Sequence, residues 1–248
     1  MHAVGIDEDY VKRAIAEGVS VLGFSDHAPI TFSDGYTSYF KMLPEELPAY
    51  VSSVLSLREK YADKIKIHLG LETEYYERFF EKSLDLWRTQ PIEYIILGQH
   101  FVGDECEVVR DPSPSPSDSI ERVKKYVDLV LSGVSSHRFT YIAHPDIINY
   151  TGGDIDAYLG QMERLIRAAK SLGMPLEYNL LGQRMQRCYP REEFWRLAAS
   201  LGATAIIGCD AHEPWRVADK DELSVAYRFI DKIGISLADR ATLVNPFP

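Results

Sequence analysis

Hydrophobic positions follow two different periods along the chain, and these periods predict alternating strands and helices. Short apolar or strictly alternating runs are typical of strands, whereas apolar positions recurring every three or four residues are typical of amphipathic helices. The strand-like segments are residues 19–24, 65–72, 92–97, 139–143, 174–179 and 203–207. The helix-like segments are residues 7–18, 44–62, 77–89, 119–132, 155–171, 191–201 and 220–232. Strand therefore alternates with helix through the whole sequence.

Two longer segments between these elements lack either period and are predicted to be loops. Residues 30–43 contain several aromatic side chains, and residues 103–118 contain three prolines among serines. Because the alternation resumes after residue 118, the proline-rich segment is interpreted as a loop or lid and not as a domain boundary. At the other end of the pattern, Asp7 is expected to cap the first helix and Gly18 to end it.

The end of each predicted strand carries a polar side chain that can bind a metal or a hydrogen-bonding group. Alternating strands and helices imply a parallel sheet with crossover helices. In a closed barrel the carboxyl ends of all strands meet at one mouth, whereas an open sheet gathers polar residues only near its switch point. The sequence therefore predicts an α/β fold of the TIM-like barrel kind. The residues at the strand ends are His27, Glu72, His100, His144, Glu177 or Asn179, and Asp210 with His212.

Composition narrows the class of protein. A chain of 248 residues, 46% of them hydrophobic, is long enough for one large domain with a full core. The net charge of −10 argues against nucleic acid or an anionic membrane as a partner. The chain has no GxGxxG or GK[ST] loop, which disfavours a nucleotide-binding fold. Its three cysteines are scattered, and it has neither a signal-peptide pattern nor a long apolar run, so we expect a cytoplasmic protein.

Asp210 and His212 are the pair from which a metal site is inferred. They are two residues apart after an apolar run, so on an extended backbone both side chains leave from one face. The alternative is an aspartate that caps the next turn and a histidine that packs in the core. Because zinc, manganese and iron take imidazole and carboxylate ligands, the repetition of such residues at successive strand ends favours the metal site. The candidate ligands are His2, His27, Glu72, His100, His144, Asp210 and His212.

These motifs together resemble the PHP family of metal-dependent phosphoesterases and, within it, the histidinol-phosphate phosphatases of histidine biosynthesis. The resemblance covers essentially the whole chain, in order, and implies a single PHP domain over residues 1–248. It also implies a distorted seven-stranded (β/α)7 barrel with up to three divalent ions, Zn, Mn or Fe, at its mouth. The matching stretches are Gly23-Phe24-Ser25-Asp26-His27-Ala28-Pro29, Gly70-Leu71-Glu72, Gly98-Gln99-His100, Ala143-His144-Pro145-Asp146, Glu177-Tyr178-Asn179 and Gly208-Cys209-Asp210-Ala211-His212.

The sequence departs from the family pattern at its start. The family opens with a strand ending in His-x-His, followed shortly by another His, and His2 matches only that later one. We expect the barrel to lack its first strand, which exposes two strand edges and leaves homodimerisation across the gap open. Since the match begins abruptly and in phase with the motif, the hypothesis is that Met1 is an internal methionine of a longer chain. The DNA upstream of Met1 tests this.

The resemblance also implies roles for particular residues in hydrolysis of a small phosphomonoester, most directly L-histidinol phosphate. Glu72 is expected to bridge metal ions and Asp210 to transfer a proton to the leaving group. Arg184 is expected to bind the phosphate, with Arg187 as a second candidate, because a guanidinium matches a phosphate bidentately. Asn179 is expected to contact the substrate. For either arginine, the alternative is a surface residue on a loop.

Other functions stay open at this stage. One is a PHP phosphoesterase of different specificity, and another is an inactive, metal-poor barrel caused by the missing first strand. An amidohydrolase also places His and Asp at barrel strand ends, but Glu72 and Arg184 fit phosphoester chemistry better.

Overall fold

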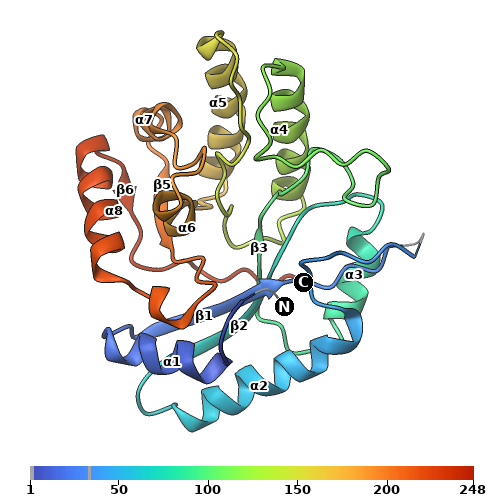
Figure 1. Ribbon diagram of the computed structural model, residues 1–248, viewed down its shortest axis with the longest axis vertical. Helices are drawn as coiled ribbons and strands as arrows, with labels where there is room; N and C mark the ends of the chain where they lie inside the picture. Colours follow the sequence, from blue (N-terminus) through green and yellow to red (C-terminus); the bar gives the residue numbers. More distant parts are fainter. Residues whose placement is uncertain (1–2, 33–34) are drawn as a thin grey trace.

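The computed structural model describes residues 3–32 and 35–248. Parallel strands lie inside an outer layer of helices (Figure 1). The strands are β1 (Val21–His27), β2 (Lys66–Thr73), β3 (Tyr94–Leu97), β4 (Leu176–Asn179), β5 (Thr204–Gly208) and β6 (Ser236–Leu237). The helices are α1 (Asp7–Ala16), α2 (Leu47–Lys60), α3 (Phe80–Trp87), α4 (Ile120–Ser135), α5 (Ile155–Ser171), α6 (Leu180–Arg184), α7 (Glu192–Ser200) and α8 (Lys220–Ile233), with short 3-10 turns η1 (Pro44–Glu46) and η2 (Pro214–Arg216).

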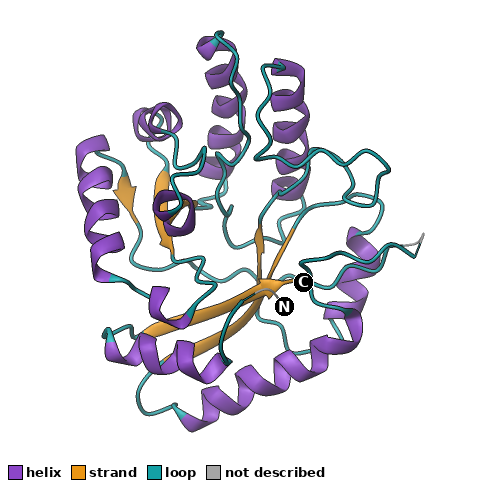
Figure 2. Cartoon of the chain, in the orientation of Figure 1, coloured by secondary structure: helices purple, strands orange, loops and turns teal. Residues whose placement is uncertain are grey.

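The strands form two three-stranded parallel sheets, β1-β2-β3 and β4-β5-β6 (Figure 2). The α/β class and the parallel strands predicted from the sequence are therefore confirmed. Residue 142 joins the two sheets, because it makes a parallel bridge to Leu97 of β3 and another to Leu176 of β4. The order of pairing is thus β1-β2-β3, then residue 142, then β4-β5-β6.

The segment at 139–143 is shorter as a strand than its hydrophobic pattern predicts. It lies in the sheet, since the amides of Thr140 and Ala143 donate to carbonyls of β3. On its other side the neighbour at the start of β4 is Pro175, which has no amide hydrogen to donate. Only residue 142 therefore bridges on both sides, and the prediction of a full strand here is wrong.

The two ends of this order, β1 and β6, are not paired with each other in the described ranges. Every residue of β1 is at least partly exposed, whereas β3 and β4 are buried throughout. Closure of the barrel by hydrogen bonds is therefore not observed between these strands. At this edge, the chain entering α1 lies against the segment after β5, because the Val4 amide donates to the His212 carbonyl at 2.8 Å.

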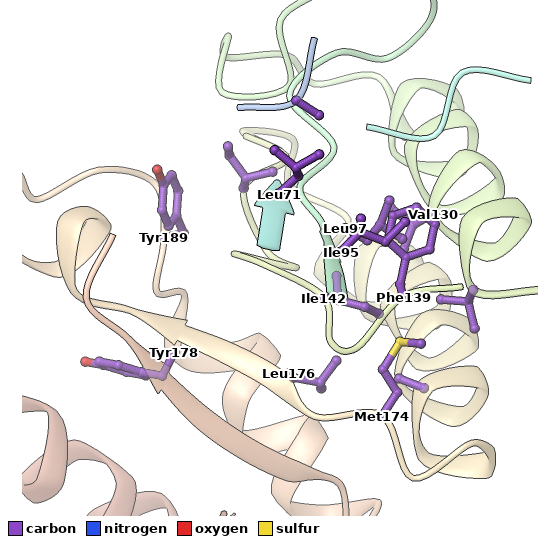
Figure 3. Close-up of a cluster of buried hydrophobic side chains, with 14 of the residues drawn as sticks. Leu71, Ile95, Leu97, Val130, Phe139, Ile142, Met174, Leu176, Tyr178 and Tyr189 are labelled. Atoms are coloured by element: carbon purple, nitrogen blue, oxygen red, sulfur yellow. The ribbon is translucent and has the colours of Figure 1, made fainter. Parts of the chain in front are cut away.

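The hydrophobic core fills the space between the sheets and the helices. Side chains of β3 and residue 142 pack against Val130 of α4 and against Phe139, as Figure 3 shows. Tyr189 belongs to the same buried cluster and lies on the other side of it from Val130 in this view (Figure 3). The core thus holds the strands in register while their carboxyl ends remain accessible to polar side chains.

One local prediction needs correction, and two short elements were not predicted from the sequence. Asp7 does not cap α1, because Ile6 occupies that position and the Asp7 carboxylate instead accepts from Ser53 at 2.5 Å. Helix α6 and the short strand β6 have no counterpart among the predicted elements. No helix in the described ranges is long and apolar enough to cross a membrane.

Candidate metal centre

Glu72 lies at the centre of the candidate site, near the end of β2. The register pairs it with His27, the last residue of β1, and with Ile96 of β3. Its carboxylate reaches over Gly98, where a Cβ atom would lie only 2.1 Å from Oε1 of Glu72. A glycine at position 98 is therefore required for this carboxylate to occupy its position.

Two histidines face this carboxylate from the neighbouring strand ends. The Nε2 atom of His144 lies 3.1 Å from Oε1 of Glu72, and the Nε2 atom of His100 lies 3.5 Å from the same oxygen. The rings of His100 and His144 are 4.9 Å apart, and those of His27 and His100 are 5.1 Å apart. Three strand ends thus bring imidazole nitrogens around one carboxylate oxygen.

The donor set and its spacing fit a divalent cation. One ligand atom from each of His27, Glu72 and His100 lies within 4.8 Å of the others. The contacts of Glu72 with His144 and His100, 3.1 and 3.5 Å, bracket the separation of two ligands on a tetrahedral zinc ion, roughly 3.3 Å. Imidazole and carboxylate together suit zinc, manganese or iron. The residues present therefore fit the metal centre that the sequence predicts.

Burial disfavours the ionised form of Glu72 when no cation is bound. Burial raises the pKa of Glu72 to about 7, His100 opposes this shift, and the Asp210 carboxylate adds to it. Because a cation favours the ionised form, metal binding would relieve this penalty.

Asp210 is held in place by the buried Asn179, which also contacts the buried Glu177. The Asn179 amide nitrogen donates to Oδ2 of Asp210 at 3.0 Å and to Oε2 of Glu177 at 2.9 Å. Its amide oxygen accepts from the backbone amide of Gly182 at 2.8 Å and so caps α6, which begins at Leu180. Asn179 is buried and engaged on both sides, so these contacts support a role in positioning Asp210.

Glu177 also supports His144. Its Oε2 atom accepts from the His144 amide at 2.9 Å, and its other oxygen occupies space beside Gly208, where a Cβ atom would lie 1.8 Å away. Burial raises the pKa of Glu177 to about 7, opposed by His144 and increased by Asp210. The Glu177 carboxylate therefore contacts both the backbone of His144 and the side chain of Asn179, which orients Asp210.

The remaining predicted ligands are His212 and His2. The Nδ1 atom of His212 lies 3.4 Å from Oδ1 of Asp210 and 3.2 Å from the carbonyl of the same residue. β5 ends at Gly208 and Asp210 has a positive φ of 43°, so the extended backbone expected for this pair is not observed, although the two side chains lie close together. His2 lies outside the described residues.

The two predicted phosphate-binding arginines have different surroundings. Arg184, in α6, donates from Nη1 to Glu222 at 3.0 Å, and Glu222 also accepts from Arg216. Arg187 donates to the Tyr189 hydroxyl at 2.9 Å, and the Tyr189 ring lies 5.6 Å from the His144 ring. The Tyr189 ring therefore lies between Arg187 and the His144 ring. Arg184 lies on α6, the helix that Asn179 caps.

Sequence reasoning missed a group of charged residues behind His100. Glu74 accepts from Lys41 and contacts His100, and Lys41 also pairs with Glu105. For Glu74 a signal was present in the sequence, because a residue two positions after Glu72 on an alternating strand lies on the same face. Lys41 and Glu105 lie in the two loop segments, where no periodicity marks a buried position.

Residues 1–181 match the PHP domain. A probable histidinol-phosphatase of Deinococcus radiodurans is 27% identical over 241 residues, covering 94% of this chain and 86% of that protein. A probable histidinol-phosphatase of Schizosaccharomyces pombe is 24% identical, covering 95% of this chain and 84% of that protein.

Solved structures show the same fold. The histidinol phosphate phosphatase of Lactococcus lactis, in complex with zinc, L-histidinol and phosphate, aligns with a TM-score of 0.72 at 22% identity, over 98% of this chain and 92% of that one. A putative histidinol phosphatase of Listeria monocytogenes aligns with a TM-score of 0.69 at 19% identity, over 90% of this chain and 95% of that one.

The fold and the site together define a parallel α/β protein with a histidine and carboxylate centre at its strand ends. With the domain match covering most of the chain, the family follows: this protein belongs to the PHP family.

Proposed function

We propose that this protein is a metal-dependent phosphomonoesterase that hydrolyses L-histidinol phosphate to L-histidinol and phosphate. The observation that carries the proposal is the convergence of His100 and His144 on one carboxylate oxygen of Glu72. Membership of the PHP family supports the reaction class. Relatives named histidinol-phosphatase, matched over most of the chain, support the substrate.

The proposed metal ligands are Glu72, His27, His100, His144, Asp210 and His212, with His2 as a further candidate from the sequence. A divalent cation held by these residues would supply Lewis-acid activation of water and would neutralise charge on the phosphoryl group. The chain's own part is to keep the ligands oriented. The buried Asn179 holds the side chain of Asp210, and the buried Glu177 holds the backbone amide of His144.

The proposed phosphate clamp consists of the two arginines that follow β4. Glu222 engages Nη1 of Arg184, and Nη2 lies 4.0 Å from Glu213, beyond hydrogen-bond distance, so Nη2 is the proposed donor to a phosphate oxygen. Arg187 is oriented by Tyr189, beside His144, where its charge can act on an anion at the metal centre. Asp210 is the proposed group that passes a proton to the leaving alkoxide, since it is partly exposed at the same centre.

The experiment that tests this function has two measurements. Bound metal per chain is determined first, and phosphate release is then followed from histidinol phosphate and from a panel of other phosphomonoesters, with added Zn²⁺ or Mn²⁺ and with chelator. Metal-dependent release confined to histidinol phosphate is the expected result. Equal release from the whole panel would assign a different specificity. A purified protein without metal and without activity would replace the proposal by an inactive barrel.

A further inference from the structure

Two loops meet the candidate metal centre through a buried network of charges. Lys41 lies in the segment between β1 and α2, and its Nζ atom is 2.8 Å from Oε1 of Glu74 and 2.8 Å from Oε2 of Glu105. Glu105 belongs to the segment between β3 and α4, where it also accepts from the Tyr36 hydroxyl at 3.0 Å. The Lys41 side chain is 2% exposed and both carboxylates are 0% exposed.

This network touches a candidate ligand directly. The Oε1 atom of Glu74 that accepts from Lys41 lies 2.9 Å from Nδ1 of His100. The same carboxylate is paired with the Lys41 ammonium at 2.8 Å, and a buried carboxylate in such an ion pair is ionised. An ionised carboxylate only accepts hydrogen bonds, so the ring nitrogen that faces it must carry the proton. The Nε2 atom of His100 then presents its lone pair toward Glu72, 3.5 Å away.

The position of Lys41 is fixed from several sides. Its ammonium lies between two buried carboxylates and 3.8 Å from the centre of the Phe40 ring. Without the ammonium, Glu74 and Glu105 would be two buried anions with no cation between them. Their mutual repulsion would push Glu74 out of its contact with His100. Neither carboxylate is open to substrate, because both side chains are fully buried.

We propose that Lys41 is a positioning residue that acts through Glu74 to hold His100 in its Nδ1–H tautomer, with Nε2 directed at the metal. A carboxylate behind a metal-binding histidine fixes the ring orientation and increases its basicity, and loss of such a partner costs about 10- to 100-fold in metal affinity or activity. The inference deepens the proposed function, on which it rests for the presence of a metal at His100.

The first test measures metal affinity. Lys41→Met removes the charge and keeps much of the volume, and its Zn²⁺ dissociation constant is compared with that of the unsubstituted protein by competition with a chelator. We expect binding weakened by about 10- to 100-fold. Lys82→Met, at an exposed position on α3, is the matched control and should bind Zn²⁺ normally. Unchanged affinity in Lys41→Met would overturn the proposal.

The second test separates positioning from a general effect on folding. Glu74→Gln keeps the shape of the side chain, and if Lys41 acts through Glu74, the double variant should bind Zn²⁺ no more weakly than Glu74→Gln alone. Additive losses would overturn the proposed route. This comparison also covers the case in which Lys41→Met is too unstable to purify, because Glu74→Gln alone must then show the loss of affinity.

The third test needs neither metal nor activity. In the metal-free protein, ¹⁵N NMR of the histidine rings distinguishes the two neutral tautomers, with His100→Gln used to assign the signals. We expect Nδ1–H for His100, and a mixture of tautomers in Lys41→Met and Glu74→Gln. An Nε2–H signal in the unsubstituted protein would overturn the proposal. Lack of phosphatase activity with the expected NMR result would remove the proposed function and leave the role of Lys41 intact.

Discussion

The Nε2 atom of His144 lies 3.1 Å from Oε1 of Glu72, although 72 residues separate them in the sequence. The contact forms because both residues stand at carboxyl ends within the same order of parallel pairing, Glu72 on β2 and His144 just after the bridge at residue 142. Two groups of this kind, buried side by side, are stabilised when a cation lies between them.

Removal of the central carboxylate tests the candidate metal centre. Glu72→Gln keeps the size of the side chain and removes the negative charge shared by His100 and His144. We expect bound Zn²⁺ or Mn²⁺ per chain to fall, measured by elemental analysis after dialysis. Glu81→Gln on the exposed face of α3 is the control and should retain its metal. Full metal content in Glu72→Gln would exclude Glu72 as a ligand.

Gly208→Ala tests the close approach of Glu177 to the end of β5. The new Cβ atom would lie 1.8 Å from the carboxylate, so Glu177 must move and lose its contacts with Asn179 and the His144 amide. Overpacking of this kind costs about 1–3 kcal/mol of unfolding free energy, measurable by urea denaturation.

The control for that substitution lies on a helix. Gly160 of α5 has nothing within 4 Å of a Cβ position, so Gly160→Ala should stabilise the protein by about 0.5–1 kcal/mol. If both alanine variants behaved alike, the contact with Glu177 would not be the cause.

The stability of the metal-free protein should fall as the pH rises from mildly acidic to neutral. Burial raises the pKa of Glu177 from 4.5 to about 7, so the folded state binds more protons than the unfolded state between these values. The contribution of this group is complete below about pH 4.5 and is lost as the pH rises through about 7, a change on the order of 3 kcal/mol.

Glu177→Gln checks this pH dependence. The amide keeps an acceptor for the His144 backbone but cannot ionise. The unfolding free energy of the variant, relative to that of the parent, should therefore be most favourable at about pH 8. Urea unfolding with chelator present, at several pH values, measures the difference. The surface variant Glu163→Gln should follow the parent at every pH, and a parallel course for Glu177→Gln would contradict the assignment.

Arg184→Ala tests the proposed phosphate clamp. Because a hydrogen bond to a charged group contributes about 1.5–3 kcal/mol, we expect kcat/KM for histidinol phosphate to fall by about 10- to 100-fold. Metal content should not change, since no candidate ligand contacts Arg184 in the described ranges. Arg167→Ala, a surface pair on α5, is the control. Equal kinetics in both variants would remove Arg184 from the reaction.

Periodicity located most of the elements because burial of one face imposes a period on any regular segment. The helix predicted at 155–171 has the observed bounds of α5. The predicted strand at 139–143 shows the limit of this reasoning. Only residue 142 forms a bridge there, and on the side of β4 Pro175 has no amide hydrogen to donate. Whether a segment becomes a strand depends on the hydrogen-bonding groups of its partners, which are distant in the sequence.

By itself, the sequence determined the class of fold and the residues placed at the strand ends, among them His27, Glu72 and Asp210. Local pattern carries that information, because side-chain period and the position after an apolar run are properties of neighbouring residues. Only the tertiary structure decided which of these groups meet at one oxygen, that Asn179 supports Asp210, and that Lys41 and Glu105 enclose Glu74. These contacts join loops and strands far apart in the chain, so burial and charge there depend on how the elements pack.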